Sequence, residues 1–133
     1  MDKGGAQRVA RYCAETVGEK LRSVSEYDET GVTTVYSRPG LREDYTDEQA
    51  AALLETAMEQ NQRLHRSNIE RAPLGEPRAG IYAFEEAFVV QLPVSETEGI
   101  VVTMDADVGT QLGGFVQALR ERMIAPSSGP RGD

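Results

Sequence analysis

The longest strand-like stretch of the sequence spans residues 78–104, where the spacing of apolar positions predicts three consecutive β-strands. Residues 80–84 are rich in β-branched and aromatic side chains, which favour strands, and Glu85 and Glu86 follow as the expected hairpin tip. Apolar positions alternate from Phe88 to Pro93, and proline is tolerated at a strand end. Residues 100–104 are almost entirely apolar, which predicts a central strand with helices over it.

The first part of the chain predicts a helix followed by a β-hairpin. Apolar residues recur at spacings of three and four between residues 7 and 24, as on one face of a helix. Gly18 lies inside this segment and would lower the stability of a helix by about 1 kcal/mol relative to alanine. Residues 25–28 and 32–37 read as two strands, and Gly31 suits the turn between them.

Two further helices are expected. Thr46 and Gln49 have the spacing of a capping box, so a helix should begin at Asp47 and end near Arg66. A last helix is predicted over residues 110–123, although Gly113 and Gly114 near its start reduce its intrinsic stability. The element order is therefore α-β-β-α-β-β-β-α.

This order predicts an α+β fold in which hairpin and meander share one sheet. Pairing of the central apolar strand with the first strand produces a five-stranded antiparallel sheet in the order 2-1-5-4-3, with helices on its faces. The domain is expected to span residues 7–124, with disordered ends at residues 1–6 and 125–133.

Composition restricts the function classes. The 133-residue chain has 22 acidic and 14 basic residues and a formal net charge of −8, which disfavours nucleic acid as a partner. No apolar run approaches the roughly 18 residues of a membrane span, and no signal peptide is recognised, so the protein is expected to be cytoplasmic, away from membranes. Lys3 and Lys20 are the only lysines, and this arginine bias with excess acid is typical of a salt-adapted proteome, or alternatively of a GC-rich genome.

Four fragments of the chain read SVSEYDETGVTTVYSR, LREDYTDEQ, FEEAFVVQLP and EGIVVTMD. They resemble a family of small uncharacterised haloarchaeal proteins. The element order and the length are also similar to the roadblock/longin-like (profilin-like) class of small domains. That second resemblance is topological, covers about residues 7–123 and rests on no diagnostic motif.

The roadblock-like resemblance implies a homodimer that pairs through its third strand with help from the second helix. It also implies a small GTPase or a scaffold protein as the partner. An exposed apolar strand edge independently favours dimerisation. The residues expected at this interface are Ile81, Tyr82, Phe84, Leu54 and Met58.

The candidates for chemistry are few. His65 is the only histidine and falls near a helix end, and Cys13 falls on the apolar side of the first helix, where a thiol is normally inert. Asp105 and Asp107 could face a divalent cation together with Glu96 or Glu98, but helix capping explains these two aspartates more simply. No cofactor, metal or catalytic residue is predicted.

A second candidate site precedes the middle helix. Tyr36, Arg38, Arg42 and Tyr45 flank its N-terminus, which could attract an anion or a partner. Acidic residues crowd the same loop and oppose a phosphate, so a solvated loop is the simpler interpretation.

Three functions remain open. The first is a non-enzymatic, dimeric protein interaction or regulatory module. The second is an acidic chaperone-like binding protein similar to the small type III secretion chaperones, which place three strands before the middle helix and two after it. The third is a small-molecule-binding or hydrolytic enzyme, which would need His65 grouped with Asp105 or Asp107 in one cleft.

Overall fold

The computed structural model describes residues 4–41, 46–66 and 73–124, except for the side chains at positions 113, 115–117, 119, 123 and 124. The elements, in chain order, are α1 (Gly5–Val17), the 3₁₀ turn η1 (Gly18–Lys20), β1 (Leu21–Asp28), β2 (Gly31–Ser37), α2 (Asp47–Arg66), β3 (Gly80–Ala83), β4 (Ala87–Pro93), β5 (Gly99–Asp105), the 3₁₀ turn η4 (Ala106–Gly109) and α3 (Thr110–Ile124).

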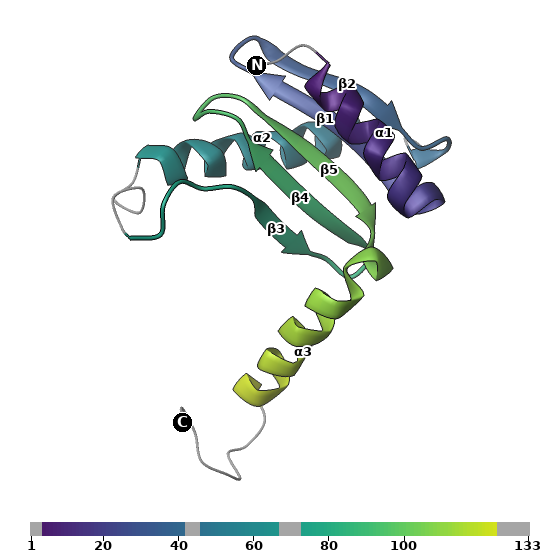
Figure 1. Cartoon of the computed structure of the whole chain (residues 1–133), viewed down its shortest axis with the longest axis vertical. Helices are drawn as coiled ribbons and strands as arrows, with labels where there is room; N and C mark the ends of the chain where they lie inside the picture. The colour runs from purple at the N-terminus through teal and green to yellow at the C-terminus, as the bar shows by residue number, and fades with distance from the viewer. Residues whose placement is uncertain (1–3, 42–45, 67–72, 125–133) are drawn as a thin grey trace.

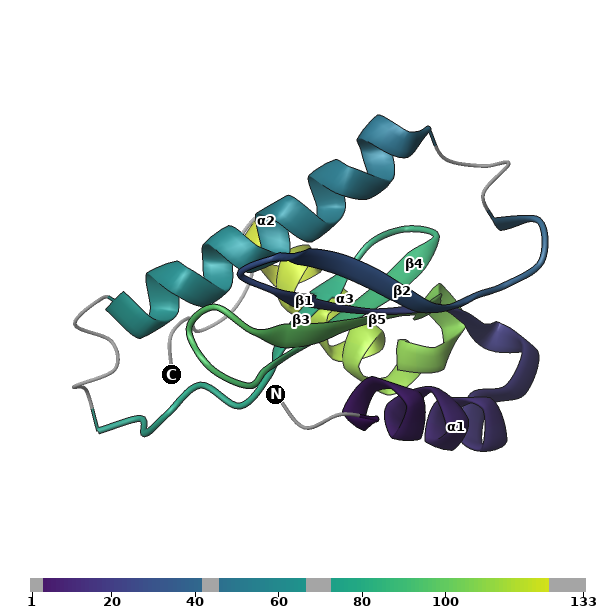
Figure 2. The same ribbon diagram turned by 90° about the horizontal axis from the view of Figure 1, so that it is seen from above.

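All five strands form one antiparallel sheet in the order β2-β1-β5-β4-β3, which confirms the predicted α+β fold and strand order. Figures 1 and 2 show α1 on one face of the sheet and α2 across the other, while α3 leads away from the end of β5. The two faces are called here the α1 face and the α2 face. None of the helices among the described residues is both long enough and apolar enough to cross a membrane.

The central strand β5 separates two apolar clusters. Ile100, Val102 and Met104 belong to the cluster on the α1 face, and Val101 belongs to the cluster under α2. All residues of β5 except Asp105 are buried, which confirms the expected two-sided burial of this strand. The sheet therefore separates two small hydrophobic cores, one packed against α1 and the other against α2.

The first helix ends earlier than the apolar spacing predicts, and this part of the prediction was wrong. Gly18 has a φ of 59° and a ψ of −127°, a positive-φ conformation that glycine adopts at little cost, so α1 stops at Val17. Leu21 and Val24 instead lie in β1, where a register shift between Leu21 and Ser23 lets both join the α1-face cluster. At its other end α1 begins at Gly5, inside the segment expected to be disordered, and Ala6 is fully buried.

The other helices begin as expected. The backbone N–H of Thr46 donates to Oε1 of Gln49, and the N–H of Gln49 donates to Oγ1 of Thr46, both at 3.0 Å, which confirms the capping box. The last helix contains Gly113 and Gly114 and nevertheless starts at Thr110. A Cβ at Gly114 would meet no neighbouring atom of the described residues within 4 Å, so close packing among them does not explain this glycine.

Candidate functional site

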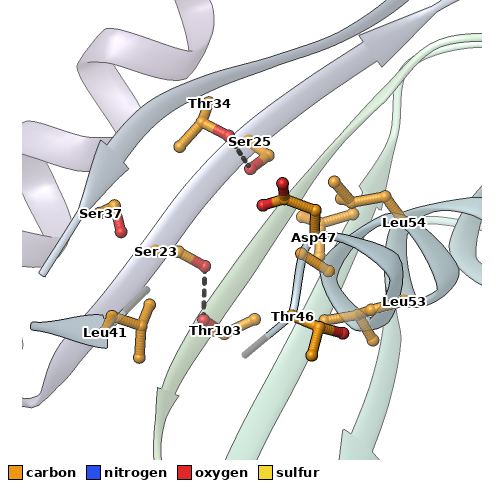
Figure 3. Close-up of a pocket in the computed structure, with 12 residues that line it drawn as sticks. Ser23, Ser25, Thr34, Ser37, Leu41, Thr46, Asp47, Leu53, Leu54 and Thr103 are labelled. Atoms are coloured by element: carbon orange, nitrogen blue, oxygen red, sulfur yellow. Dashed lines mark hydrogen bonds between the residues drawn. The ribbon is translucent and has the colours of Figure 1, made fainter. Parts of the chain in front are cut away.

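A pocket of about 110 Å³ lies between the N-terminal half of α2 and strands β1, β2 and β5 (Figure 3). Its helix side is formed by Ala50, Leu53 and Leu54, and Leu41, Thr46, Asp47 and Val101 complete the lining. Its strand side carries five hydroxyl groups, from Ser23, Ser25, Thr34, Ser37 and Thr103. The two walls therefore differ in chemistry, because one is aliphatic and the other can donate and accept hydrogen bonds.

Strand alternation and a bulge place these hydroxyls on one face. Ser23 and Ser25 are two positions apart on β1 and so point to the same side, towards α2. Thr103 lies opposite Ser23 on β5, and Thr34 lies opposite Ser25 on β2. Small side chains at these positions leave the space under α2 that larger apolar residues would fill.

The hydroxyl groups pair with one another across the strands. The hydroxyl oxygens of Ser23 and Thr103 are 2.6 Å apart, and those of Ser25 and Thr34 are 3.4 Å apart. Ser25 and Thr103 are buried at the floor of the pocket, whereas Asp47 and Ala50 are exposed at its mouth. Figure 3 shows the Asp47 carboxylate directed from α2 towards the strands.

The C-terminal half of α2 meets the same sheet face through a buried amide. Asn61 is fully buried, and its Nδ2 donates to Oη of Tyr27 at 2.9 Å and to the carbonyl oxygen of Ser95 at 2.8 Å. Burial raises the pKa of the Tyr27 phenol, while the hydrogen bond from Asn61 acts in the opposite direction. Asn61 Oδ1 and Gln91 Oε1 are also buried, and neither accepts a hydrogen bond from a described residue.

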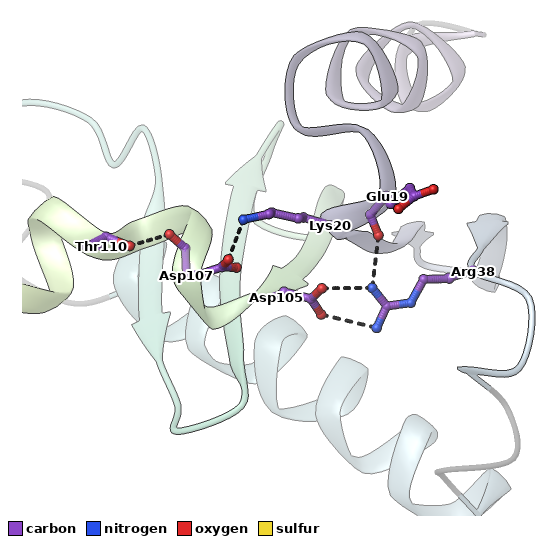
Figure 4. Close-up of polar contacts among 6 residues, drawn as sticks. All are labelled: Glu19, Lys20, Arg38, Asp105, Asp107 and Thr110. Atoms are coloured by element: carbon purple, nitrogen blue, oxygen red, sulfur yellow. Dashed lines mark hydrogen bonds and ion pairs between the residues drawn. The ribbon is translucent and has the colours of Figure 1, made fainter.

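Charged residues meet at the end of the sheet where β1, β2 and β5 converge (Figure 4). Arg38 donates two hydrogen bonds to the Asp105 carboxylate, at 3.0 and 3.1 Å, and a third to the carbonyl oxygen of Glu19 at 3.0 Å. Arg22 Nη1 lies 3.5 Å from Asp105 Oδ1. The hydrogen bonds from Arg38 are the main cause that lowers the pKa of Asp105.

A second ion pair adjoins the first. Lys20 of η1 donates to the Asp107 carboxylate in η4, and this hydrogen bond raises the pKa of Lys20. Thr110 donates its hydroxyl proton to the carbonyl oxygen of Asp107. The side chain of Asp105, at the N-terminal boundary of η4, makes no capping hydrogen bond, so the capping role expected for it was wrong.

The candidate anion loop is only partly described. Arg38 is engaged by Asp105, and Tyr36 packs against the α1-face cluster, on the opposite side of the sheet from α2. Arg42 and Tyr45 lie outside the described residues. The described part of this set therefore forms an internal ion pair and a core contact.

The residues expected at a dimer interface occupy two environments. Ile81 lies on the edge strand β3 and Phe84 directly after it, and 48% and 57% of their surfaces are exposed. Tyr82, Leu54 and Met58 pack against the cluster under α2. Two of the five residues are therefore exposed. The other three pack between β3 and α2.

His65 and the two aspartates do not share a site. His65 Nδ1 donates to the carbonyl oxygen of Asn61 at 2.9 Å, and Asn61 contacts the turn before β5. Asp105 lies at the other end of β5. Among the described residues, no group of three or more His, Cys, Asp or Glu side chains could hold a metal ion.

Partial burial raises the pKa of the Cys13 thiol, which packs against the α1-face cluster.

The sequence reasoning missed the pocket and Asn61. A signal for Asn61 exists, since it follows Ala57 by four positions and Met58 by three, on the stripe that faces the sheet. The pocket had a weaker signal in the alternating serines of β1, and Thr103 joins them only through the strand order.

Comparison with known proteins gives a family and no function. No curated protein matches the sequence. The profile of a family described as "Domain of unknown function (DUF7522)" matches residues 7–124, which is most of the chain. The protein therefore belongs to the DUF7522 family.

Proposed function

We propose that the protein is a non-enzymatic, homodimeric interaction module of roadblock-like topology in the cytoplasm of a salt-adapted, haloarchaeal cell. Its partner surface is the β3 edge, and the observation that carries the proposal is the exposure of Ile81 on that edge strand and of Phe84 directly after it. An apolar strand edge is a template for pairing with another chain unless it is covered.

The sheet face beside this edge supports the same role. The β3–β4 register sets Ile81 opposite Val90 and Ala83 opposite Phe88, on the α1 face. Figure 1 shows α1 over the β1–β2 side of this face and α3 leading away from the sheet. Phe88 is buried against η4, whereas Ile81 and Ala83 of β3 remain exposed on this face and are available to a second copy.

Charge makes such a dimer sensitive to salt. Each chain carries a formal charge of −8, so two copies repel one another in dilute buffer. At molar salt the screening length falls to about 3 Å, which removes most of this repulsion while apolar contacts persist. Dimerisation that strengthens with potassium chloride suits a salt-adapted cytoplasm.

The alternatives have less support. Two strands precede α2 and three follow it, the reverse of the arrangement in the small secretion chaperones. An enzyme has less support because His65 and Asp105 lie at opposite ends of β5. A small GTPase or scaffold as the further partner rests on the roadblock-like resemblance alone.

Light-scattering mass after size exclusion in molar KCl tests the proposal. The wild-type chain should have about twice the 14.5 kDa mass of one chain, and Phe84→Lys should be monomeric, because a charge on the paired edge must be desolvated. Val32→Lys is the matched control, since Val32 is also exposed but lies on the opposite edge strand, β2. A monomeric wild-type protein, or a Phe84→Lys variant that remains dimeric, would overturn the proposal.

A further inference from the structure

We propose that the pocket between α2 and strands β1, β2 and β5 binds a short aliphatic ammonium compound. In this arrangement the ammonium group lies between the Asp47 carboxylate and the strand hydroxyls, and the carbon chain lies on Leu53 and Leu54. This binding site is independent of the β3 edge, so neither proposal depends on the other.

The size of the pocket sets the size of the ligand. An apolar protein cavity of about 150 Å³ accommodates benzene, and this pocket has a volume of about 110 Å³. It therefore suits a molecule of roughly five non-hydrogen atoms. The buried floor at Ser25 and Thr103 and the exposed mouth at Asp47 allow such a molecule to enter at one end.

The two walls determine which part of the ligand is polar and which part is apolar. Leu53 and Leu54 offer only apolar contact, whereas the strand hydroxyls offer oxygen lone pairs that accept hydrogen bonds. Each hydroxyl pair uses one donor and one acceptor internally and so retains acceptor capacity on both oxygens. A ligand with a polar head and a short aliphatic tail matches both walls.

Charge selects a cation over an anion. Asp47 contributes the only charged side chain to the described lining, and it is negative. The positive end of the α2 dipole would favour an anion, but the Thr46–Gln49 capping box occupies amide groups there and Asp47 and Glu48 offset the dipole. An ammonium head also supplies three N–H donors to a wall rich in acceptors.

The experiment is a titration of the ¹⁵N-labelled full chain in constant molar salt with n-butylammonium, n-butanol and butyrate, three probes of similar size and different charge. Butylammonium should shift the amide signals of Ser23, Ser25, Thr34 and Thr103 saturably. Butanol should bind several-fold more weakly, and butyrate should produce no saturable shift. Equal binding of butanol and butylammonium, or saturable binding of butyrate, would overturn the assignment.

Two charge-matched variants test the role of Asp47. Asp47→Asn should weaken butylammonium binding by up to about fivefold, the upper end of the range for an exposed ion pair. Glu48→Gln removes the same charge one residue away, outside the pocket lining, and should leave the affinity unchanged. Equal losses of butylammonium affinity in both variants would show that binding depends only on the overall negative charge of this region, and would overturn the site. Ala50→Leu, which enlarges a lining side chain at the mouth, should abolish the shifts, and persistence of these shifts would also count against the site.

Discussion

Replacing Asn61 by alanine should lower the free energy of unfolding by about 3 kcal/mol, because this amide closes the contact between α2 and the sheet. Nδ2 serves three acceptors: Tyr27 Oη at 2.9 Å, the Ser95 carbonyl at 2.8 Å and, with a longer contact of 3.4 Å, the Glu98 carbonyl. A buried group left without its partner costs roughly 1–3 kcal/mol. Two close acceptors would lose their donor, and the small cavity adds to that loss.

The Tyr27→Phe variant measures how much the Tyr27 hydroxyl contributes to the free energy of unfolding, separately from the other contacts of Asn61. It removes one of the acceptors while Asn61 keeps both carbonyls, so it should cost about 1 kcal/mol. The double variant should be less destabilised than the sum of the two single variants by about 1 kcal/mol, since the phenol has already lost its donor in Asn61→Ala. This coupling is the signature of the hydrogen bond itself.

The assay is guanidinium unfolding followed by far-UV circular dichroism in constant molar salt, with thermal unfolding as a second readout. A loss of 3 kcal/mol corresponds to roughly 10 °C in Tm for a chain of this length. Glu59→Ala, an exposed substitution on the same helix, should stay within about 0.5 kcal/mol of the wild type. The reasoning would be refuted by an Asn61→Ala variant no less stable than this control, or by strict additivity with Tyr27→Phe.

Three further predictions concern the end of the sheet and α3. Because Arg38 lowers the pKa of Asp105 from its ordinary value of 3.8, the stability from this pair is present above pH 3.8 and is lost as pH falls through the folded pKa. The free energy of unfolding of Asp105→Asn should therefore fall less steeply than that of the wild type as the pH is lowered below 3.8. An identical pH dependence in the two proteins would contradict this role. Gly109→Ala should cost about 1–3 kcal/mol in chemical unfolding, because its Cβ would lie 2.7 Å from Cζ of Phe88. The added methyl group of Gly114→Ala would meet no described neighbour, so this substitution should instead stabilise α3 by about 0.5–1 kcal/mol. The helical signal in circular dichroism should rise, and an unchanged or lower signal would contradict this prediction.

The individual strands and the start of α2 could be predicted because their signals are local, and the strand order then followed from pairing the apolar β5 with β1. The apolar run of β5 and the alternation in β4 each follow from strand geometry, and the capping box marks the start of α2 within a few residues. The end of α1 could not be read in the same way. Leu21 and Val24 are three positions apart, which imitates a helix, but the spacing arises from an irregularity in β1.

The polar contacts were harder to predict from the sequence because they join segments that are far apart along the chain. Arg38 and Asp105 are 67 positions apart, and nothing local to either residue marks the other as its partner. The capping explanation for Asp105 used only its neighbours in sequence and therefore missed this ion pair. Ser23 and Thr103 are 80 positions apart and meet only because β1 and β5 are adjacent.

The contrast between the two halves of α2 has a consequence for its motion. Its C-terminal half is secured to the β4–β5 turn through Asn61, whereas its N-terminal half lies over small hydroxyl side chains and open space. Backbone amides near Asn61 should exchange with deuterium at rates close to those of global unfolding, and amides near Leu53 should exchange faster through local opening. Such local opening of the N-terminal half would change the volume of the pocket beneath it while the C-terminal half and the sheet stay folded.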